Sequence, residues 1–229
     1  MREKIALVTG ANGGLGIHVT KALLEAGFLV AGLAPTIKQA DFTHSHFTAI
    51  TAKLDSLDAA SRATQTVLTK FGQIDLLAHL VGGFAGGPSL AETDDATFQR
   101  MFDMNVNSAF HIIRAVLPGM RKAANGRIIA IGSRAAESPG AGVGAYSASK
   151  AALVSLVRTV AVENKDAAIT ANVILPGTID TPVNRKAMPG ADTSQWVDPA
   201  SIADLIVWLA SDSAKDVTGA TIPVYGRGL

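Results

Sequence analysis

Short apolar runs alternate with helical patterns along the whole chain, and this alternation restricts the possible folds more than any other feature of the sequence. Most of the runs lack the in-and-out pattern of a half-exposed strand, which is typical of strands covered on both faces of a parallel sheet. We therefore predict a doubly wound α/β fold with a parallel sheet of about seven strands. The predicted strands are residues 5–8, 29–33, 49–54, 74–81, 127–131, 171–175 and 221–225. Pro223 should place the last of them at an edge of the sheet, because proline has no N–H to donate to a neighbouring strand.

Two of the helical patterns carry an apolar face. The first follows the first predicted strand, and we expect Gly27 to end it, because glycine readily takes the left-handed conformation found after helices. Its apolar face consists of Leu15, Val19, Ala22, Leu23 and Ala26. A later apolar face consists of Phe98, Phe102, Val106, Phe110 and Ile113. The chain shows no linker, low-complexity tract or internal repeat, so we predict one domain over residues 1–229.

Charge and hydropathy argue against several classes of protein. The formal net charge is +1 and no stretch is rich in lysine or arginine, so we expect no nucleic-acid or membrane partner. The most apolar stretch, residues 22–34, is interrupted by Glu25 and is too short to span a membrane. The first residues do not resemble a signal peptide, and we expect a cytoplasmic protein. His44 and His46 have no accompanying ligands at metal-site spacing, so we predict no metal site.

A glycine-rich turn directly follows the first predicted strand and leads into the first helix. It reads Thr-Gly-Ala-Asn-Gly-Gly-Leu-Gly over residues 9–16. Glycines permit a tight turn and let phosphate groups approach the backbone N–H groups at the positive end of a helix. At the start of a chain-long alternation of strands and helices, this turn predicts a dinucleotide-binding site.

A tyrosine, a lysine and a serine form a second motif. Tyr146 and Lys150 lie four residues apart, and Ser133 lies thirteen residues before Tyr146, after a predicted strand. Positions i and i+4 of a helix share a face, so we expect the ammonium of Lys150 beside the phenol of Tyr146. Such a charge lowers the pKa of a phenol by roughly 1–3 units, toward the range of an efficient general acid or base. With Ser133 as a hydrogen-bond donor to a substrate oxygen, the motif predicts proton transfer to a carbonyl or from an alcohol.

Together, these motifs resemble the short-chain dehydrogenase/reductase family of single-domain Rossmann-fold oxidoreductases, which use NAD or NADP. The resemblance extends over nearly the whole chain, with the motifs in the order of the family. It implies hydride transfer between the nicotinamide and a small carbonyl or alcohol substrate. The catalytic residues that it implies are Asn105, Ser133, Tyr146 and Lys150. The cofactor-binding residues that it implies are Gly10, Asn12, Gly13, Gly14, Leu15, Gly16, Asp55, Gly82, Tyr146, Lys150, Pro176, Gly177 and Thr181.

The resemblance also implies a role for individual residues. Asp55, after the third predicted strand, is expected to contact the adenine, and Thr181 to contact the nicotinamide amide. Asn105 is expected to hold a water molecule of the proton relay. Lys150 is expected to bind the nicotinamide ribose in addition to its effect on the tyrosine.

The segment after the fourth predicted strand departs from the family pattern. The family usually has Asn-Asn-Ala-Gly there, whereas this chain has His-Leu-Val-Gly at residues 79–82. The contacts that those asparagines make in the central sheet must therefore be replaced, and we interpret His79 as a structural residue. The glycine-rich continuation, residues 82–87, either lines the cofactor cleft or forms a mobile connection.

The choice between NAD and NADP depends on the region after the second predicted strand. An acid about 20 residues past the glycine turn would bind the ribose 2′-hydroxyl of NAD. This chain has no acid between Glu25 and Asp41, and Ala34 and Pro35 stand where an acid or an arginine is expected. Lys38 is the only nearby base that could meet a 2′-phosphate. The sequence therefore favours NADP, but only slightly.

The sequence leaves the substrate open. Residues 180–192 are similar to a stretch of the dihydropteridine reductases, although those enzymes generally lack a match to Ser133 and carry an acid after the second strand. A carbonyl reductase such as a 3-oxoacyl-carrier-protein reductase is at least as well supported. Arg185 and Lys186 could attract an acidic substrate, or form a solvated pair on a loop. A non-catalytic NAD(P)-binding sensor or scaffold is the alternative of another class, and the intact serine, tyrosine and lysine argue against it.

The helix that contains Tyr146 also bears on assembly. Residues 151–157 are apolar on nearly every side, which is typical of a helix that is deeply buried or packs against another subunit. Since the family commonly assembles through this region, we expect a homodimer or a homotetramer.

Overall fold

The computed structural model describes residues 2–227 and contains a seven-stranded sheet in which every neighbouring pair of strands is parallel. The strand order is β3-β2-β1-β4-β5-β6-β7, so the predicted α/β fold is confirmed. Pro223 lies in the edge strand β7, as predicted. The strands are β1 (Ile5–Thr9), β2 (Leu29–Ala34), β3 (Phe47–Thr51), β4 (Leu76–His79), β5 (Gly126–Ile131), β6 (Ile169–Pro176) and β7 (Thr221–Val224).

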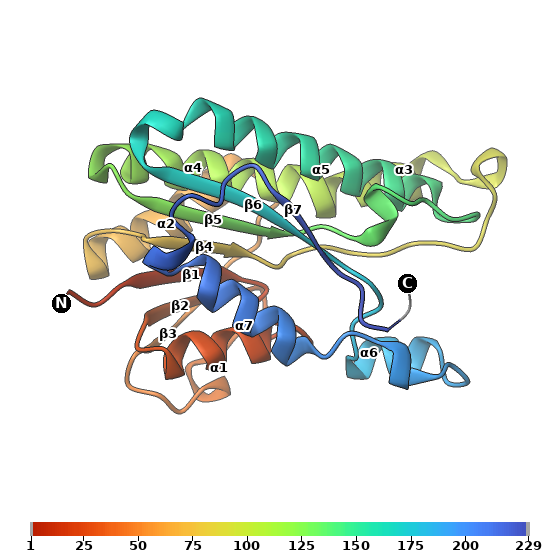
Figure 1. Ribbon diagram of the computed structural model, residues 1–229, viewed down its shortest axis with the longest axis horizontal. Helices are drawn as coiled ribbons and strands as arrows, with labels where there is room; N and C mark the ends of the chain where they lie inside the picture. The colour runs from red at the N-terminus through yellow and green to blue at the C-terminus, as the bar shows by residue number, and fades with distance from the viewer. Residues whose placement is uncertain (1, 228–229) are drawn as a thin grey trace.

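Helices cover both faces of the sheet and form two separate hydrophobic cores (Figure 1). Helices α2, α4 and α5 pack on one face, and α1 and α7 pack on the other. Gly27 follows the end of α1 with a φ of 84°, which agrees with its predicted role at the end of this helix. The helices are α1 (Gly16–Glu25), α2 (Leu57–Phe71), α3 (Asp95–Phe102), α4 (Ser108–Ala123), α5 (Gly144–Glu163), α6 (Pro182–Ala187) and α7 (Pro199–Leu209).

Every predicted strand differs from the structure at one end or both, and the third and fourth differ most. The third was predicted at residues 49–54 but lies at Phe47–Thr51, because its pairing with β2 ends where Thr51 faces Ala34, the last residue of β2. The fourth was predicted at residues 74–81 but covers only Leu76–His79. Its pairing with β1 ends where His79 faces Thr9, because the chain after Thr9 leaves the sheet in the glycine turn.

The predicted apolar face on a later helix is wrong in part, because Ile113 lies in the core but Phe98 and Phe110 face outward. The pattern spans α3, a π-helical turn at Asp103–Asn107, and α4. Phe98 and Phe110 are each 43% exposed, whereas the polar side chains of Asn105 and Ser108 are buried. Because Asn105 and Ser108 bind the chain at the end of β4, they turn the helix so that the phenylalanines face outward.

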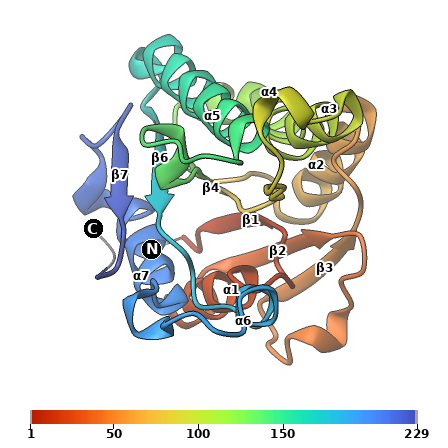
Figure 2. The ribbon, with the colours of Figure 1, turned by 90° about the vertical axis from the view of Figure 1, so that its right-hand side faces the viewer.

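The carboxyl ends of the parallel strands meet at one edge of the sheet (Figure 2). The glycine turn follows β1 there, and the segments after β4, β5 and β6 leave the sheet at the same edge. Parallel α/β sheets bind ligands at this edge. Within residues 2–227, none of the helices is long and apolar enough to cross a membrane.

Candidate active site

The glycine turn has the shape needed to bring phosphates close to backbone. The N–H of Gly10 donates to the carbonyl oxygen of Leu33 at 2.7 Å, and the N–H of Gly13 donates to the carbonyl oxygen of Gly10 at 2.9 Å. A Cβ at Gly16 would lie 2.0 Å from the carbonyl oxygen of Gly10, so only glycine fits there. Leu15 is the residue before α1, and its side chain is half-buried. The turn leads directly into the amino end of α1, an arrangement that fits the pyrophosphate of a dinucleotide.

The segment after β6 lies against this turn. A Cβ at Gly14 would be 2.9 Å from the Cβ of Thr181, so the two predicted cofactor-binding segments are in contact. The hydroxyl of Thr181 accepts a hydrogen bond from the N–H of Asn184 at 3.3 Å and caps α6. Pro176 ends β6, and Gly177 lies so close to the backbone of Tyr225 that a side chain would not fit.

Two other residues, Asn12 and Asp55, were predicted to contact the cofactor. Asn12 is half-buried in the glycine turn, and its side-chain amide donates to the hydroxyl of Thr36 at 3.3 Å. Asp55 is exposed between β3 and α2. The sequence did not point to Thr36, which follows β2 and joins the glycine turn to the region where the ribose would lie.

The structure brings the predicted catalytic side chains together at the carboxyl edge of the sheet. Helix α5 begins at Gly144, so Tyr146 and Lys150 lie on its first two turns, and Ser133 follows β5. The ammonium of Lys150 is buried and donates a hydrogen bond to the carbonyl oxygen of Ile131 at 2.8 Å. The phenol of Tyr146 is hydrogen-bonded to the side chain of Ser133.

Asn105 occupies the π-helical turn and joins this group to the chain after β4. Its side chain accepts from the N–H of Gly83 at 2.9 Å and donates to the carbonyl oxygen of Gly83 at 3.1 Å. It also donates to the hydroxyl of Ser149 at 3.0 Å, and that hydroxyl donates to the carbonyl oxygen of Tyr146 at 2.7 Å. A Cβ at Gly82 would lie 2.8 Å from Oδ1 of Asn105 and 3.1 Å from Nζ of Lys150. The residue must therefore be glycine for these groups to meet.

Known proteins are similar to this chain over nearly its whole length. The sequence model of a family described as short chain dehydrogenase matches residues 4–192. This chain belongs to the short-chain dehydrogenase family. The 3-oxoacyl-[acyl-carrier-protein] reductase FabG of Pseudomonas aeruginosa is 32% identical to it, over 99% of this chain and 97% of the relative. The 2,3-dihydro-2,3-dihydroxybenzoate dehydrogenase of Escherichia coli is also 32% identical, over 96% of this chain and 94% of the relative.

A solved structure agrees with these relatives. The structure of Pseudomonas aeruginosa RhlG, an active-site complex with NADP, superposes with a TM-score of 0.89 and 30% sequence identity, covering 97% of this chain and 95% of that one. This chain is therefore an NAD(P)-dependent oxidoreductase that acts on a small-molecule substrate. The two relatives of equal identity have different substrates, so identity alone does not select one.

The protonation of the tyrosine and lysine in this short-chain dehydrogenase differs from the sequence prediction. Burial raises the pKa of Tyr146, while its hydrogen bond with Ser133 acts in the opposite direction. Burial lowers the pKa of Lys150 from 10.5 to about 8. The prediction that Lys150 lowers the pKa of Tyr146 is wrong for this structure, because Nζ lies 6.0 Å from the centre of the tyrosine ring and donates to Ile131 instead.

The structure shows what replaces the usual asparagine contacts after β4. His79 is buried, and its Nδ1 lies 3.0 Å from the hydroxyl oxygen of Thr9. Its Nε2 lies 3.4 Å from the hydroxyl oxygen of Ser108 on α4. The interpretation of His79 as a structural residue thus agrees with its contacts. Its partners lie far away in the sequence, so no local signal identifies them.

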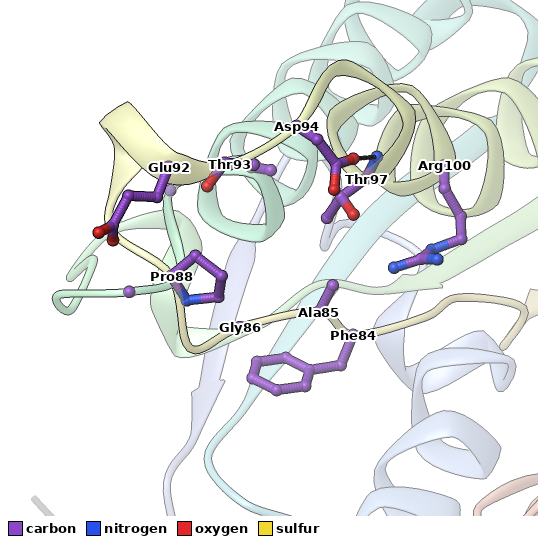
Figure 3. Close-up of a pocket in the computed structure, with 12 residues that line it drawn as sticks. Phe84, Ala85, Gly86, Pro88, Glu92, Thr93, Asp94, Thr97 and Arg100 are labelled. Atoms are coloured by element: carbon purple, nitrogen blue, oxygen red, sulfur yellow. Dashed lines mark hydrogen bonds between the residues drawn. The ribbon is translucent and has the colours of Figure 1, made fainter.

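A cavity of about 390 Å³ lies beside the catalytic group (Figure 3). Phe84, Ala85 and Gly86 form one wall, and Thr97 and Arg100 of α3 lie on the other. The ring of Phe84 is 67% exposed and stands edge to face against the ring of Tyr146, with the ring centres 5.0 Å apart. Phe84 therefore borders both this cavity and the phenol of Tyr146.

Within the described residues, no three histidine, aspartate or glutamate side chains are grouped so that they could hold a metal ion. His44 is exposed, and His46 lies 3.7 Å from a carboxylate oxygen of Glu3. These two histidines belong to the surface segment before β3.

Proposed function

We propose that this short-chain dehydrogenase interconverts a carbonyl and an alcohol, with Tyr146 as the proton donor or acceptor and Ser133, Lys150 and Asn105 in support. One observation carries the proposal above all others. Lys150 is 4% exposed and its ammonium lies in the wall of the site, where Gly82 leaves room for it. Burying a charged amine is costly, so its retention next to a phenol and a serine favours a catalytic role over a structural one.

The proposed proton path starts at the phenol. Tyr146 would give its proton to the developing alkoxide during reduction and take one from the alcohol during oxidation. The hydroxyl of Ser133 would hold the same substrate oxygen, and preorganised donors of this kind can contribute several kcal/mol. The nicotinamide cofactor, when bound, supplies or accepts the hydride.

Lys150 and Asn105 would support the cofactor and the proton supply. Lys150 would use the donors that are not taken by Ile131 to hold the nicotinamide ribose beside Tyr146. Asn105 fixes Gly83 and, through Ser149, the first turn of α5. With these contacts it would support a water chain that returns protons from bulk solvent.

We propose one domain that holds both the cofactor site and these residues, with NADP preferred over NAD. The contact between Asn12 and Thr36 places two polar side chains near the expected ribose, and Lys38 is exposed nearby. The carboxylate of Asp41 accepts from the backbone N–H of Lys38 at 3.0 Å. This hydrogen bond holds the backbone at Lys38. We expect the exposed ammonium of the same residue to meet a 2′-phosphate.

The cavity beside Phe84 supports a substrate that extends beyond its carbonyl group. Its volume of about 390 Å³ would accept an arm that packs on Phe84 and forms hydrogen bonds with Thr97 or Arg100. Among the relatives, FabG is a 3-oxoacyl reductase. Acetoacetyl thioesters are therefore the first substrates to test, together with small diketones and quinonoid dihydropterin.

The decisive variant is Tyr146→Phe, which keeps the ring and its contact with Phe84 but removes the proton. We expect it to bind NADPH as tightly as the wild type and to lose turnover by about 10²–10⁴-fold on the best carbonyl substrate. If it retains most of the activity, the proton comes from another group. If the wild type binds NADPH tightly but reduces none of these substrates, a non-catalytic sensor is the better supported function.

We also propose a homodimer or homotetramer in the cytoplasm. Phe98 and Phe110 expose aromatic rings on α3 and α4, and Phe98 stacks on Phe102 with ring centres 4.8 Å apart. Val162 of α5 is 71% exposed. Light scattering should show an assembly that the double substitution of Phe98 and Phe110 by serine weakens, and a wild-type monomer at working concentration would contradict it.

A further inference from the structure

His79 is a buried ionisable side chain to which the mechanism above gives no role. It is the last residue of β4 and is 1% exposed. Its side chain contacts Thr9 at the end of β1 and Ser108 in the first turn of α4. Its imidazole has two ring nitrogens on opposite sides that can bridge two partners. Its contacts therefore decide what it can do.

The hydrogens of the neighbouring groups fix the form of the imidazole. The hydroxyl of Thr9 accepts from the N–H of Leu80 at 3.1 Å, so its own hydrogen is free to point at Nδ1 of His79. The hydroxyl of Ser108 donates to the carbonyl oxygen of Met104 at 2.7 Å, so it must accept from Nε2. Each hydrogen is then used once, and the ring is neutral with its proton on Nε2.

The electrostatic environment of His79 agrees with a neutral imidazole. Burial, and next the positive charge of Lys150, lower the pKa of His79 from 6.5 to about 3. A second positive charge at this depth would act against Lys150. A neutral imidazole leaves Lys150 as the only cation among these buried groups.

The chain of hydrogen bonds ends at the π-helical turn. Met104, whose carbonyl oxygen receives the hydroxyl of Ser108, immediately precedes Asn105. Asn105 holds Gly83 and Ser149 from the other side of the same turn. The turn is therefore anchored twice, once by its own asparagine and once through Ser108 and His79.

We propose that His79 is a positioning residue: as a neutral Nε2–H imidazole it ties the ends of β1 and β4 to the π-helical turn and so holds Asn105 in place for proton transfer. The kinetic part of this inference rests on the proposed function, whereas the tautomer and the placement of Asn105 do not. Removal of the bridge leaves the buried hydroxyl of Thr9 without an acceptor and that of Ser108 without a donor, and the loss of such bonds in a buried site is costly.

Two variants at position 79 separate hydrogen bonding from volume. His79→Phe fills the space but offers neither a donor nor an acceptor, whereas the amide of His79→Gln can accept from Thr9 and donate to Ser108. We expect His79→Phe to lose kcat by about tenfold or more, with the Kd for NADPH changed by less than about threefold. We expect His79→Gln to recover most of that loss. His111→Gln, at a half-buried histidine elsewhere on α4, is the matched control and should change neither quantity.

Ser108→Ala breaks the bridge at its other end and remains informative if His79→Phe does not fold. It should reduce kcat in the same way while His79 is intact. A kcat within about twofold of the wild type in both His79→Phe and Ser108→Ala would overturn the kinetic part of the inference.

Nuclear magnetic resonance gives a readout that needs no turnover. The ¹⁵N signals of His79 should show a protonated Nε2 and a bare Nδ1 from pH 5 to 9, a range well above its pKa of about 3. The side-chain amide signals of Asn105 should shift in Ser108→Ala and His79→Phe, but not in His111→Gln. An imidazole that titrates near pH 6.5, or an Asn105 amide that is unmoved in both bridge variants, would overturn the positioning role. Lack of carbonyl turnover by the wild type would overturn the proposed function and with it the kinetic part, but not the tautomer of His79 or its placement of Asn105.

Discussion

Two buried charges lie at opposite edges of the sheet, and their surroundings differ. Asp75 precedes β4 at the amino edge, and its carboxylate accepts four hydrogen bonds of 2.8–2.9 Å. The donors are the side chains of Arg2, Gln73 and Asn125 and the N–H of Ile5. Lys150, at the carboxyl edge, donates one hydrogen bond to the described residues, to the carbonyl oxygen of Ile131.

This difference separates a structural charge from the one that we propose to be functional. The carboxylate of Asp75 is fully satisfied, so it fastens the end of β4 to its neighbours and has no capacity left for a ligand. The ammonium of Lys150 has three donors and retains two for other partners. An incompletely satisfied buried charge is destabilising, and such groups are found where chemistry requires them.

The largest expected effect is on turnover at the carboxyl edge. Lys150→Met keeps the length of the side chain but removes the charge and its donors, and we expect kcat to fall by about 10²–10⁴-fold because the group proposed to hold the nicotinamide ribose beside Tyr146 is lost. Steady-state rates on the best carbonyl substrate measure this. Asp75→Ala is the matched control at the other edge, and its rate per folded molecule should be unchanged. Equal losses of kcat in the two variants would show that Asp75 and Lys150 do not differ in function.

The next effect is on stability at the amino edge. Asp75→Ala leaves the N–H of Ile5 and the amides of Gln73 and Asn125 without their acceptor, so we expect the free energy of unfolding to fall by about 3 kcal/mol. Urea denaturation followed by circular dichroism measures it. A loss below about 0.5 kcal/mol would show that this carboxylate is not a structural anchor.

The pH dependence of stability should reveal the cost of burying Lys150. The folded protein loses this proton near pH 8, whereas the unfolded chain keeps it until about pH 10.5, so the unfolded state binds more protons between these values. Stability relative to Lys150→Met should therefore rise with pH over this window, by up to about 3 kcal/mol. Parallel stability curves for the two proteins from pH 7 to 10 would be inconsistent with a buried, destabilised ammonium.

The smallest effect concerns the exposed Lys38. An exposed charge contributes little, so Lys38→Gln should weaken NADPH binding by about fivefold or less and leave NADH binding unchanged. Titration of each cofactor by fluorescence tests this. Clear preference of the wild type for NADH would contradict the choice of NADP.

The sequence was informative wherever a property depends on neighbours along the chain. Buried parallel strands show themselves as apolar runs, and the glycine turn is local, so the fold and the place of this turn after β1 were predictable. The four-residue spacing of Tyr146 and Lys150 on a helix also transferred directly to the structure, where both lie on α5. The family resemblance supplied the rest of the candidate site.

Properties that depend on distant contacts were not predictable. The pKa of Tyr146 was expected to fall, but burial raises it, and burial follows from packing between β5, α5 and the loop of Phe84. Phe98 and Phe110 face outward because buried polar side chains hold the π-helical turn. The spacing of residues in the sequence does not predict such a turn. The partners of His79 lie 70 residues before it and 29 residues after it.

A direct titration of Lys150 tests the central claim that its charge is held incompletely satisfied at the catalytic edge. The ¹³Cε signal of Lys150 can be followed by nuclear magnetic resonance from pH 6 to 11 and assigned by its loss in Lys150→Met. The account predicts a midpoint near pH 8, well below the ordinary value of 10.5. A midpoint at 10.5 or above would mean that the ammonium is as well stabilised as in water, and would contradict the account.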